Sequence, residues 1–230
     1  MKTIGLIGGM SWESSIEYYR IINEEVQKKL GKSHSCSCIM YSFDFEPIKE
    51  LQHQNKWKEL TDIMIKTSQN LENAGADFIV ICTNTMHIMA EDIEKNISIP
   101  VFHLVDAVAD RIQNKKIKKV GLLGTKFTME QDFYRKRLKK IHNIDVIIPN
   151  DEERNIIHSI IYNELIKGII KKESRNKYKK IIKNLKKKGA QGVILGCTEI
   201  PLLIKQKDSP ITVFDTSTIH AVKAVGFALK

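Results

Sequence analysis

Two nine-residue stretches, GADFIVICT at residues 75–83 and GAQGVILGC at residues 189–197, align with each other without a gap. Each begins with a Gly-Ala turn and continues through an apolar strand into polar residues. A second pair, TIGLIGG at residues 3–9 and KVGLLGT at residues 119–125, repeats at nearly the same offset. The sequence therefore predicts two similar halves, with Thr83 of one half at the position that Cys197 occupies in the other.

Strands and helices alternate along the whole chain, which is typical of α/β layers around mainly parallel sheets. Apolar runs predict strands at residues 3–8, 36–45, 78–82, 99–102, 117–124, 146–148, 193–195 and 211–214. Apolar residues at helical spacing predict helices at residues 14–30, 56–74, 86–95, 104–113, 128–141, 151–167, 175–188 and 216–229. We expect two doubly wound α/β lobes, residues 1–115 and 116–230. Whether the last helix packs on the first lobe stays open.

The chain of 230 residues carries a formal net charge of +10, and this charge is unevenly spread. Residues 1–115 hold 12 Lys and Arg against 16 Asp and Glu, whereas residues 116–230 hold 25 against 11. The basic runs are rich in lysine and poor in aromatics, which favours a solvated surface over a nucleic-acid partner. No apolar run approaches the ~18 residues of a membrane span, and neither a signal peptide nor a C-x-x-C pair is recognisable. We expect a cytoplasmic protein with no nucleic-acid or membrane partner.

Two motifs have ordinary explanations. Residues 5–9 spell G-x-x-G-G, which departs from the dinucleotide fingerprint G-x-G-x-x-G, so no nucleotide cofactor is predicted. This turn is expected to direct backbone N–H groups at a carboxylate near the start of the following helix. Cys36 and Cys38 fall on one face of a predicted strand. Without further ligand residues nearby, they are predicted to be buried packing residues and not a metal site.

Cys197 ends a buried strand at the edge of the sheet where ligands of open α/β folds bind. The residues that follow it predict a helix start, and a helix N-terminus lowers the pKa of a thiol below ~8.5. Thr83 alone would be an ordinary strand-end hydroxyl, but opposite Cys197 it becomes a candidate proton relay. Two facing halves of this kind suit an enzyme that removes a proton from one face of a carbon and returns it on the other.

Four segments resemble the aspartate/glutamate racemase family: GLIGGMSWES at residues 5–14, NTMH at 84–87, GLLGT at 121–125 and GCTEI at 196–200. The resemblance runs in order through essentially the whole chain. It implies a cofactor-independent amino-acid racemase with two pseudo-symmetric lobes, an active site in the cleft between them, a small amino-acid substrate and a homodimer. It also implies that Met10 and Gln52 line the substrate.

The first lobe departs from the family pattern. Most members carry a cysteine in each lobe, the first within Cys-Asn-Thr-Ala-His, but here Thr83 precedes Asn84 and Thr85. Cys82 lies one position earlier, which turns a strand side chain to the opposite face, so Cys82 would replace Thr83 only if the end of the strand twisted. The Thr83/Cys197 pair resembles the subgroup that acts on L-aspartate and L-glutamate. In that subgroup's pattern Cys197, as a thiolate, takes the Cα proton of the L-substrate, and Thr83 donates a proton on the other face.

A threonine hydroxyl has no accessible alkoxide near neutral pH, so we expect L-substrates to be processed much better than D-substrates. Preorganised donors at the substrate carboxylate can stabilise the carbanion. The expected donors follow the strands at helix starts and in the second glycine turn: Asn84, Thr85, Thr125, Thr128 and Thr198. No metal is expected. His87 follows Thr83 by one helical turn and either orients it or is structural. No basic residue can be assigned to the side-chain carboxylate, so the preferred amino acid stays open.

Two other interpretations remain. One is a decarboxylase or isomerase of small carboxylates with the same fold that needs a single cysteine, as in the arylmalonate decarboxylases. The other is a non-catalytic protein that binds small carboxylates. The polar residues after Thr83 and Cys197 favour the racemase, and only the enzyme interpretations require a reactive Cys197.

Overall fold

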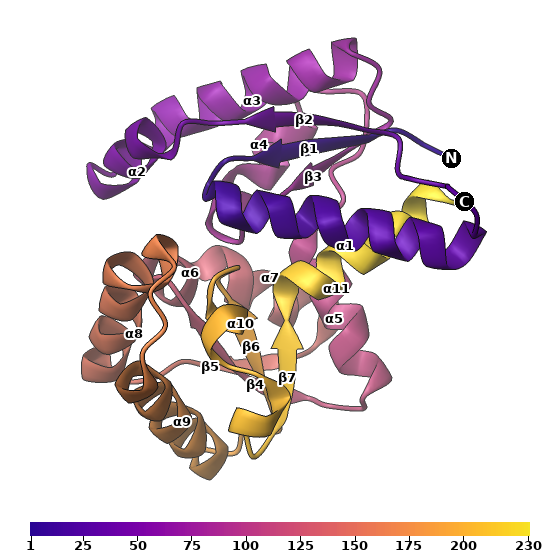
Figure 1. The fold of residues 1–230 in the computed structure, drawn as a ribbon. Coiled ribbons are helices and arrows are strands. Elements are labelled where there is room, and N and C mark those ends of the chain that lie inside the picture. Colours follow the sequence, from indigo (N-terminus) through magenta and orange to yellow (C-terminus); the bar gives the residue numbers. More distant parts are fainter. The chain divides into compact units, whose positions relative to one another are not determined.

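The computed structural model describes residues 1–230, and the chain divides into two compact units (Figure 1). Unit 1 comprises Met1–Leu104 together with His220–Lys230, and unit 2 comprises Val105–Ile219. The lobe boundary expected from the repeat, between residues 115 and 116, stays a prediction. None of the helices combines the length and the apolar character that crossing a membrane requires.

Unit 1 contains a three-stranded sheet with helices on both faces. Its elements are β1 (Ile4–Gly8), α1 (Trp12–Leu30), β2 (Cys38–Ser42), α2 (Phe45–His53), α3 (Trp57–Asn73), β3 (Phe78–Ile81), the 3₁₀ helix η1 (Thr85–Met89) and α4 (Ala90–Glu94). The strand order is β2-β1-β3, and every pair is parallel. The predicted strand at residues 99–102 is reduced to a single bridge between Val101 and Ile79.

Unit 2 contains a four-stranded parallel sheet in the order β5-β4-β6-β7. Its elements are α5 (Leu104–Asn114), β4 (Lys119–Gly124), α6 (Lys126–Glu130), α7 (Asp132–His142), β5 (Asp145–Ile147), α8 (Asp151–Asn163), the 3₁₀ helix η2 (Leu165–Lys167), α9 (Lys172–Lys187), β6 (Gly192–Gly196), α10 (Ile200–Leu203), the 3₁₀ helix η3 (Gln206–Asp208), β7 (Thr212–Asp215) and α11 (Thr216–Ala228). Helices α5 and α11 each contain residues of both units. The predicted fold class, α/β with two parallel sheets, is confirmed.

The repeated Gly-Ala turns have the same conformation in both units. Gly75 and Gly189 follow α3 and α9 with φ values of 95° and 94°, a region that favours glycine. The next N–H group, of Ala76 or Ala190, donates to a carbonyl in the last turn of the helix, at 3.0 Å in both units. Each turn thus ends a helix and starts the strand that leads to Thr83 or Cys197.

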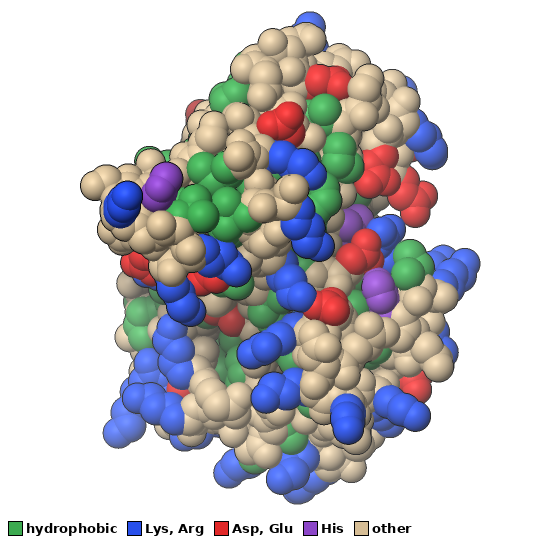
Figure 2. All heavy atoms as spheres, turned by 90° about the vertical axis from the view of Figure 1, so that its right-hand side faces the viewer, with side chains coloured by type: hydrophobic (Ala, Val, Ile, Leu, Met, Phe, Trp, Pro, Cys, Tyr) green, Lys and Arg blue, Asp and Glu red, His purple; other side chains and the backbone are tan.

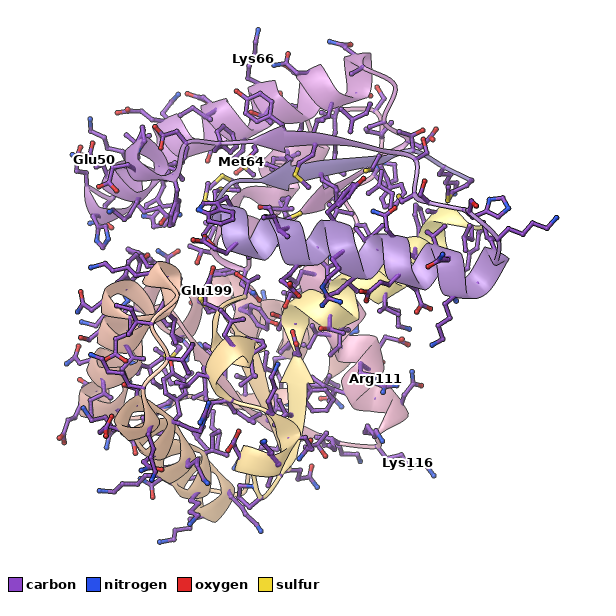
Figure 3. All side chains as sticks on the ribbon, viewed as in Figure 1. Glu50, Met64, Lys66, Arg111, Lys116 and Glu199 are labelled. Carbon is purple, nitrogen blue, oxygen red and sulfur yellow. The ribbon has the colours of Figure 1, made fainter.

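Helices cover both faces of the unit 1 sheet (Figure 1). On one face the strands pack against α2 and α3 through residues such as Leu60 and Met64. Figure 3 shows Met64 directed at the sheet, whereas Lys66 on the same helix points away from it. On the other face the strands pack against α1 and the end of α11, through Tyr18 and Val225 among others. Because both faces of the sheet are covered by apolar residues, the sequences of the buried strands do not alternate between apolar and polar residues.

Several predicted elements differ from the structure, and one helix was missed. The strand expected at residues 36–45 is limited to β2, because the Asp44 side chain accepts a hydrogen bond from the Glu46 N–H and starts α2. Helix α2 itself was not predicted. The helix expected at residues 128–141 is divided into α6 and α7, because Gln131 adopts an extended conformation between them.

A buried histidine joins three segments of unit 1. His220 Nε2 lies 2.7 Å from the Phe102 carbonyl oxygen and therefore donates to it, which leaves Nδ1 to accept from the Tyr18 hydroxyl at 3.0 Å. The His220 ring also stacks on Phe102 at 5.6 Å between ring centroids. Burial, followed by the nearness of the second imidazole, His87, lowers the pKa of His220 to about 3. The ring is therefore neutral in the folded protein.

We predict that the stability of unit 1 falls as the pH is lowered from about 7 towards 3. An unfolded histidine has a pKa near ~6.5, so the unfolded state binds the extra proton throughout this window. His220 alone contributes up to about 1.4 kcal/mol per pH unit to this fall. Urea unfolding at several pH values measures the slope. In the variant His220→Phe, stability at pH 7.5 should drop by about 1–3 kcal/mol, because two polar groups lose their partner. An unchanged dependence of stability on pH in that variant would contradict the assignment of this dependence to His220.

Candidate active site

Two glycines bring β4 and β6 of unit 2 close together at the carboxyl edge of the sheet. Gly124 and Gly196 are paired across these strands. A Cβ atom on Gly124 would lie 2.8 Å from the Gly196 carbonyl oxygen, and one on Gly196 would lie 2.9 Å from the Leu123 carbonyl oxygen. Only glycine fits at either position without displacing the backbone. Cys197 follows at this edge, where the turn that contains Thr125 and Thr128 leaves the neighbouring strand.

The Cys197 thiol makes a hydrogen bond to a buried carboxylate. Its Sγ donates to Glu199 Oε2 at 2.8 Å, and the Thr198 hydroxyl donates to the same oxygen at 3.0 Å. Cys197 is 9 % exposed and Glu199 is 4 % exposed. Figure 3 shows Glu199 close to the carboxyl end of β6. A thiol, a hydroxyl and a carboxylate are thus gathered within three consecutive residues.

This environment raises the pKa of Cys197 well above its usual value, which contradicts the lowered pKa expected from the helix start. Burial is the largest cause, followed by the charge of Glu199 and by the hydrogen bond to its carboxylate. The backbone N–H groups of Thr198 and Glu199 act in the opposite direction, as expected for a helix start, but they are outweighed. In this state Cys197 is a thiol whose proton already points at an acceptor.

Two tyrosines contribute to the surroundings of Cys197. Tyr162 on α8 and Tyr178 on α9 each have a raised pKa, caused first by their own burial and next by the negative charge of Cys197 when ionised. Tyr178 belongs to the same apolar cluster as Cys197. These aromatic side chains therefore help to exclude water from the thiol, which strengthens electrostatic interactions there.

Thr125 and Thr128 contact each other just after the carboxyl end of the neighbouring strand, β4. The Thr125 side chain caps α6 by accepting from the Thr128 N–H at 3.3 Å, and the two hydroxyl oxygens lie 3.2 Å apart. Both side chains are buried. The structure thus places Thr125, Thr128, Cys197 and Thr198 at one edge of the unit 2 sheet.

Thr83 holds the equivalent position in unit 1, two residues after β3, and it is partly exposed. His87 Nδ1 lies 2.8 Å from the Thr83 carbonyl oxygen, and His87 Nε2 accepts from the Leu104 N–H at 3.2 Å. Because Nε2 accepts, Nδ1 must carry the proton and donate. His87 therefore holds the backbone of Thr83. Cys82 points into the core that faces α1, where burial raises its pKa.

The remaining predicted residues of unit 1 are buried near the carboxyl edge of its sheet. Met10 follows β1, and Gln52 on α2 donates from Nε2 to the Met86 sulfur at 3.3 Å. Asn84 and Thr85, at the start of η1, are 2 % and 6 % exposed. The structure therefore places Met10, Gln52, Thr83, Asn84 and Thr85 in unit 1.

One N–H group of the glycine turn after β1 does not have the expected role. The Gly9 N–H donates to the Ser15 hydroxyl at 2.8 Å, so this group is already used inside the protein and is not directed at a carboxylate. A Cβ atom on Gly9 would collide with the backbone of Phe43, and Gly9 has a φ of 83°. Close packing against the residues after β2 is therefore what requires glycine here.

Glu199 is the functional candidate that sequence reasoning missed. The available signal was a carboxylate two positions after a strand-end cysteine, in the segment Cys197-Thr198-Glu199. Its interpretation as part of a helix start hid the possibility that the side chain turns back to the thiol. The chain contains no group of three or more His, Cys, Asp or Glu side chains placed to hold a metal ion.

We predict that Glu199→Gln lowers the pKa of Cys197, because it removes a negative charge beside the thiol. Alkylation of Cys197 by iodoacetamide at pH 8 should accelerate about tenfold, the effect of about one pKa unit. Glu199→Asp, which keeps the charge, is the matched control and should change the rate much less. Peptide mass spectrometry follows the rate at Cys197 separately from the other cysteines. A slower reaction in Glu199→Gln would show that the carboxylate does not oppose ionisation.

Comparisons with known proteins identify the family of this chain. The family model described as Asp/Glu/Hydantoin racemase matches residues 7–224. A Yersinia pestis structure provisionally assigned as an Asp/Glu racemase is 49 % identical over all of both chains, with a TM-score of 0.94. An aspartate racemase homologue from Pyrococcus horikoshii is 38 % identical over all of both chains, with a TM-score of 0.86. The broad specificity amino-acid racemase RacX of Bacillus subtilis is 26 % identical, with 96 % of each chain covered. The chain belongs to the Asp/Glu/hydantoin racemase family and is an isomerase of the amino-acid racemase type.

Proposed function

We propose that this enzyme interconverts the L- and D-forms of aspartate and glutamate without a cofactor, and that it favours the L-substrates. Cys197 would act on the Cα proton of the L-form and Thr83 on the opposite face. The observation that carries this proposal is the Cys197 thiol hydrogen-bonded at 2.8 Å to the buried Glu199 carboxylate. A thiol becomes a base only after it loses its proton, and an acceptor for that proton lies beside it.

In the proposed reaction Glu199 takes the thiol proton and Cys197 becomes the thiolate. The thiolate then removes the Cα proton of the L-amino acid, which leaves a carbanion and restores the thiol. The Thr83 hydroxyl protonates the carbanion from the other side to give the D-amino acid, and the resulting alkoxide regains a proton from water. The hydroxide formed in this way is neutralised by the proton that Glu199 releases, which returns Glu199, Cys197 and Thr83 to their starting states. Because an alkoxide is far less accessible than a thiolate near neutral pH, the reverse start from Thr83 is slow.

Preorganised donors are proposed to stabilise the developing negative charge. The N–H groups of Thr198 and Glu199 oppose the rise in the pKa of Cys197, so they favour negative charge at this point. The buried hydroxyls of Thr125 and Thr128 and the side chains of Asn84 and Thr85 are proposed to bind the substrate carboxylates, next to Met10 and Gln52. The choice of aspartate and glutamate rests on the family and on the aspartate racemase homologue.

A free amino acid is the partner that this chemistry requires, and we propose a homodimer as in the family resemblance. On the face drawn in Figure 2, Lys and Arg side chains are most numerous in the lower part and are interspersed with other residues. This distribution supports our expectation of a solvated basic surface and no nucleic-acid partner. All four cysteines are free thiols, which suits the reducing cytoplasm that we propose as the location.

We predict that Cys197→Ala abolishes exchange of the Cα proton of L-aspartate. Removal of the base should reduce the rate on the order of 10³-fold or more. Proton NMR in deuterated water follows loss of the Cα signal, and chiral chromatography follows the appearance of D-aspartate. Cys36→Ser, which removes a thiol away from the carboxyl edge, should keep the wild-type rate. Exchange that survives in Cys197→Ala would rule out this assignment.

We predict that Thr83→Cys accelerates Cα exchange of D-aspartate. A thiol at this position can ionise, so the second face gains a true base. The increase should be about tenfold or more, whereas Thr83→Ser should stay near the wild-type rate because it restores only a hydroxyl. The same NMR measurement on both enantiomers tests this. Tight binding of aspartate with no exchange from either enantiomer would instead support the carboxylate-binding interpretation.

A further inference from the structure

Two cysteines lie at the start of β2, at the opposite end of the unit 1 strands from Thr83. Cys36 precedes the strand and Cys38 is its first residue. Both were predicted to be buried packing residues, but both are only partly buried. Their side chains contact the apolar cluster between the sheet and α1 from its edge. They therefore share one face of the segment and remain open to solvent.

The backbone between the two cysteines is held in place at three points. The Cys36 N–H donates to Asn23 Oδ1 on α1 at 2.9 Å. The Ser37 carbonyl oxygen accepts from the Ile4 N–H at 2.9 Å, and the hydroxyl oxygens of Ser37 and Thr3 lie 3.0 Å apart. This anchoring fixes the two sulfurs relative to each other, so little chain entropy is lost when they interact.

The thiols are close enough to interact directly. A side-chain hydrogen bond from Cys36 lowers the pKa of Cys38 to about 7, against a smaller opposing effect of burial. The Cys36 thiol also donates to the Ser37 carbonyl oxygen at 3.2 Å, so its proton is shared between this oxygen and Cys38. The pKa of Cys36 is raised, first by its bond to Cys38 and then by burial. A substantial fraction of Cys38 is thus thiolate near neutral pH, whereas Cys36 keeps its proton.

We propose that Cys36 and Cys38 form an oxidisable dithiol, with Cys38 as the sulfur attacked first and Cys36 as the resolving thiol. The reacting partner is a two-electron oxidant of the peroxide class. A nucleophilic, accessible thiol next to a second thiol is the arrangement that redox-sensitive cysteines share. Neither residue belongs to the proposed racemisation machinery, so the proposal is independent of it.

The chemistry balances in two steps. The Cys38 thiolate attacks one oxygen of hydrogen peroxide, the O–O bond breaks, and Cys38 sulfenic acid and one water form after protonation. The Cys36 thiol then attacks the sulfenic sulfur, the S–O bond breaks, and a Cys36–Cys38 disulfide and a second water form. Overall two thiols lose two electrons and two protons, and one peroxide is reduced to two waters.

The other two cysteines provide internal controls. Cys82 is buried and its pKa is raised, first by burial. Cys197 is also buried, and its pKa is raised by burial and by Glu199. Both should exist as thiols near neutral pH and should react more slowly than Cys38, because the thiolate is the nucleophile.

The first experiment needs no variant. The wild-type protein is treated with equimolar hydrogen peroxide at pH 7, its free thiols are blocked with N-ethylmaleimide, and tryptic peptides are analysed by mass spectrometry. The peptide of residues 33–49 contains both cysteines. We expect it to lose two hydrogen atoms and to accept no maleimide until it is reduced. Two maleimide groups on this peptide after peroxide treatment would overturn the proposal.

Variants separate the two roles. In Cys36→Ala the resolving thiol is absent, so sulfenic acid should accumulate on Cys38 and be trapped by dimedone. The same variant should slow alkylation of Cys38 at pH 7 about tenfold, because the hydrogen bond that favours the thiolate is lost. Cys36→Ser keeps a donor at this position and should retain much of the rate. Equal alkylation rates at Cys38 in wild type and Cys36→Ala would overturn the assigned roles.

Discussion

The hydrogen bond between the Cys197 thiol and the Glu199 carboxylate is the interaction on which the chemistry of unit 2 depends. Each group is buried and would be costly to leave without a partner. Cys197 and Thr198 both donate to the same carboxylate oxygen, so Glu199 is satisfied by its own neighbours in sequence. A thiolate and a carboxylate this close repel each other, which opposes ionisation of the Cys197 thiol. The thiol therefore has a proton acceptor beside it, but its ionisation is opposed until the charge around it changes.

The sheet edge that carries this contact has a strict steric requirement. Gly124 and Gly196 allow β4 and β6 to approach where a single Cβ atom would meet a backbone oxygen below 3 Å. The apolar cluster of unit 2 then covers the strand up to Cys197. Burial is the largest cause of the raised thiol pKa, so packing and acid–base chemistry at this edge cannot be separated.

The duplicated units use the same turn for different purposes. Both have a left-handed glycine, a buried alanine and a strand that ends at the functional position. In unit 1 the neutral ring of His87 holds the backbone of Thr83, and its hydroxyl stays partly exposed. In unit 2 a carboxylate acts directly on the side chain of Cys197. Unit 1 thus positions a residue that can only donate a proton readily, and unit 2 controls one that can also accept it.

The sequence by itself determined the α/β class, the places of most strands along the chain and the positions of Thr83 and Cys197 at strand ends. These follow from local signals, namely apolar runs, glycine turns and an internal repeat. It did not reveal α2 or the division of α6 from α7, which depend on single residues such as Asp44 and Gln131. Only the tertiary structure decided the sign of the Cys197 pKa shift, the use of the Gly9 N–H by Ser15, and the partial exposure of Cys36 and Cys38. Burial and side-chain direction set these properties, and both are created by neighbours from other elements.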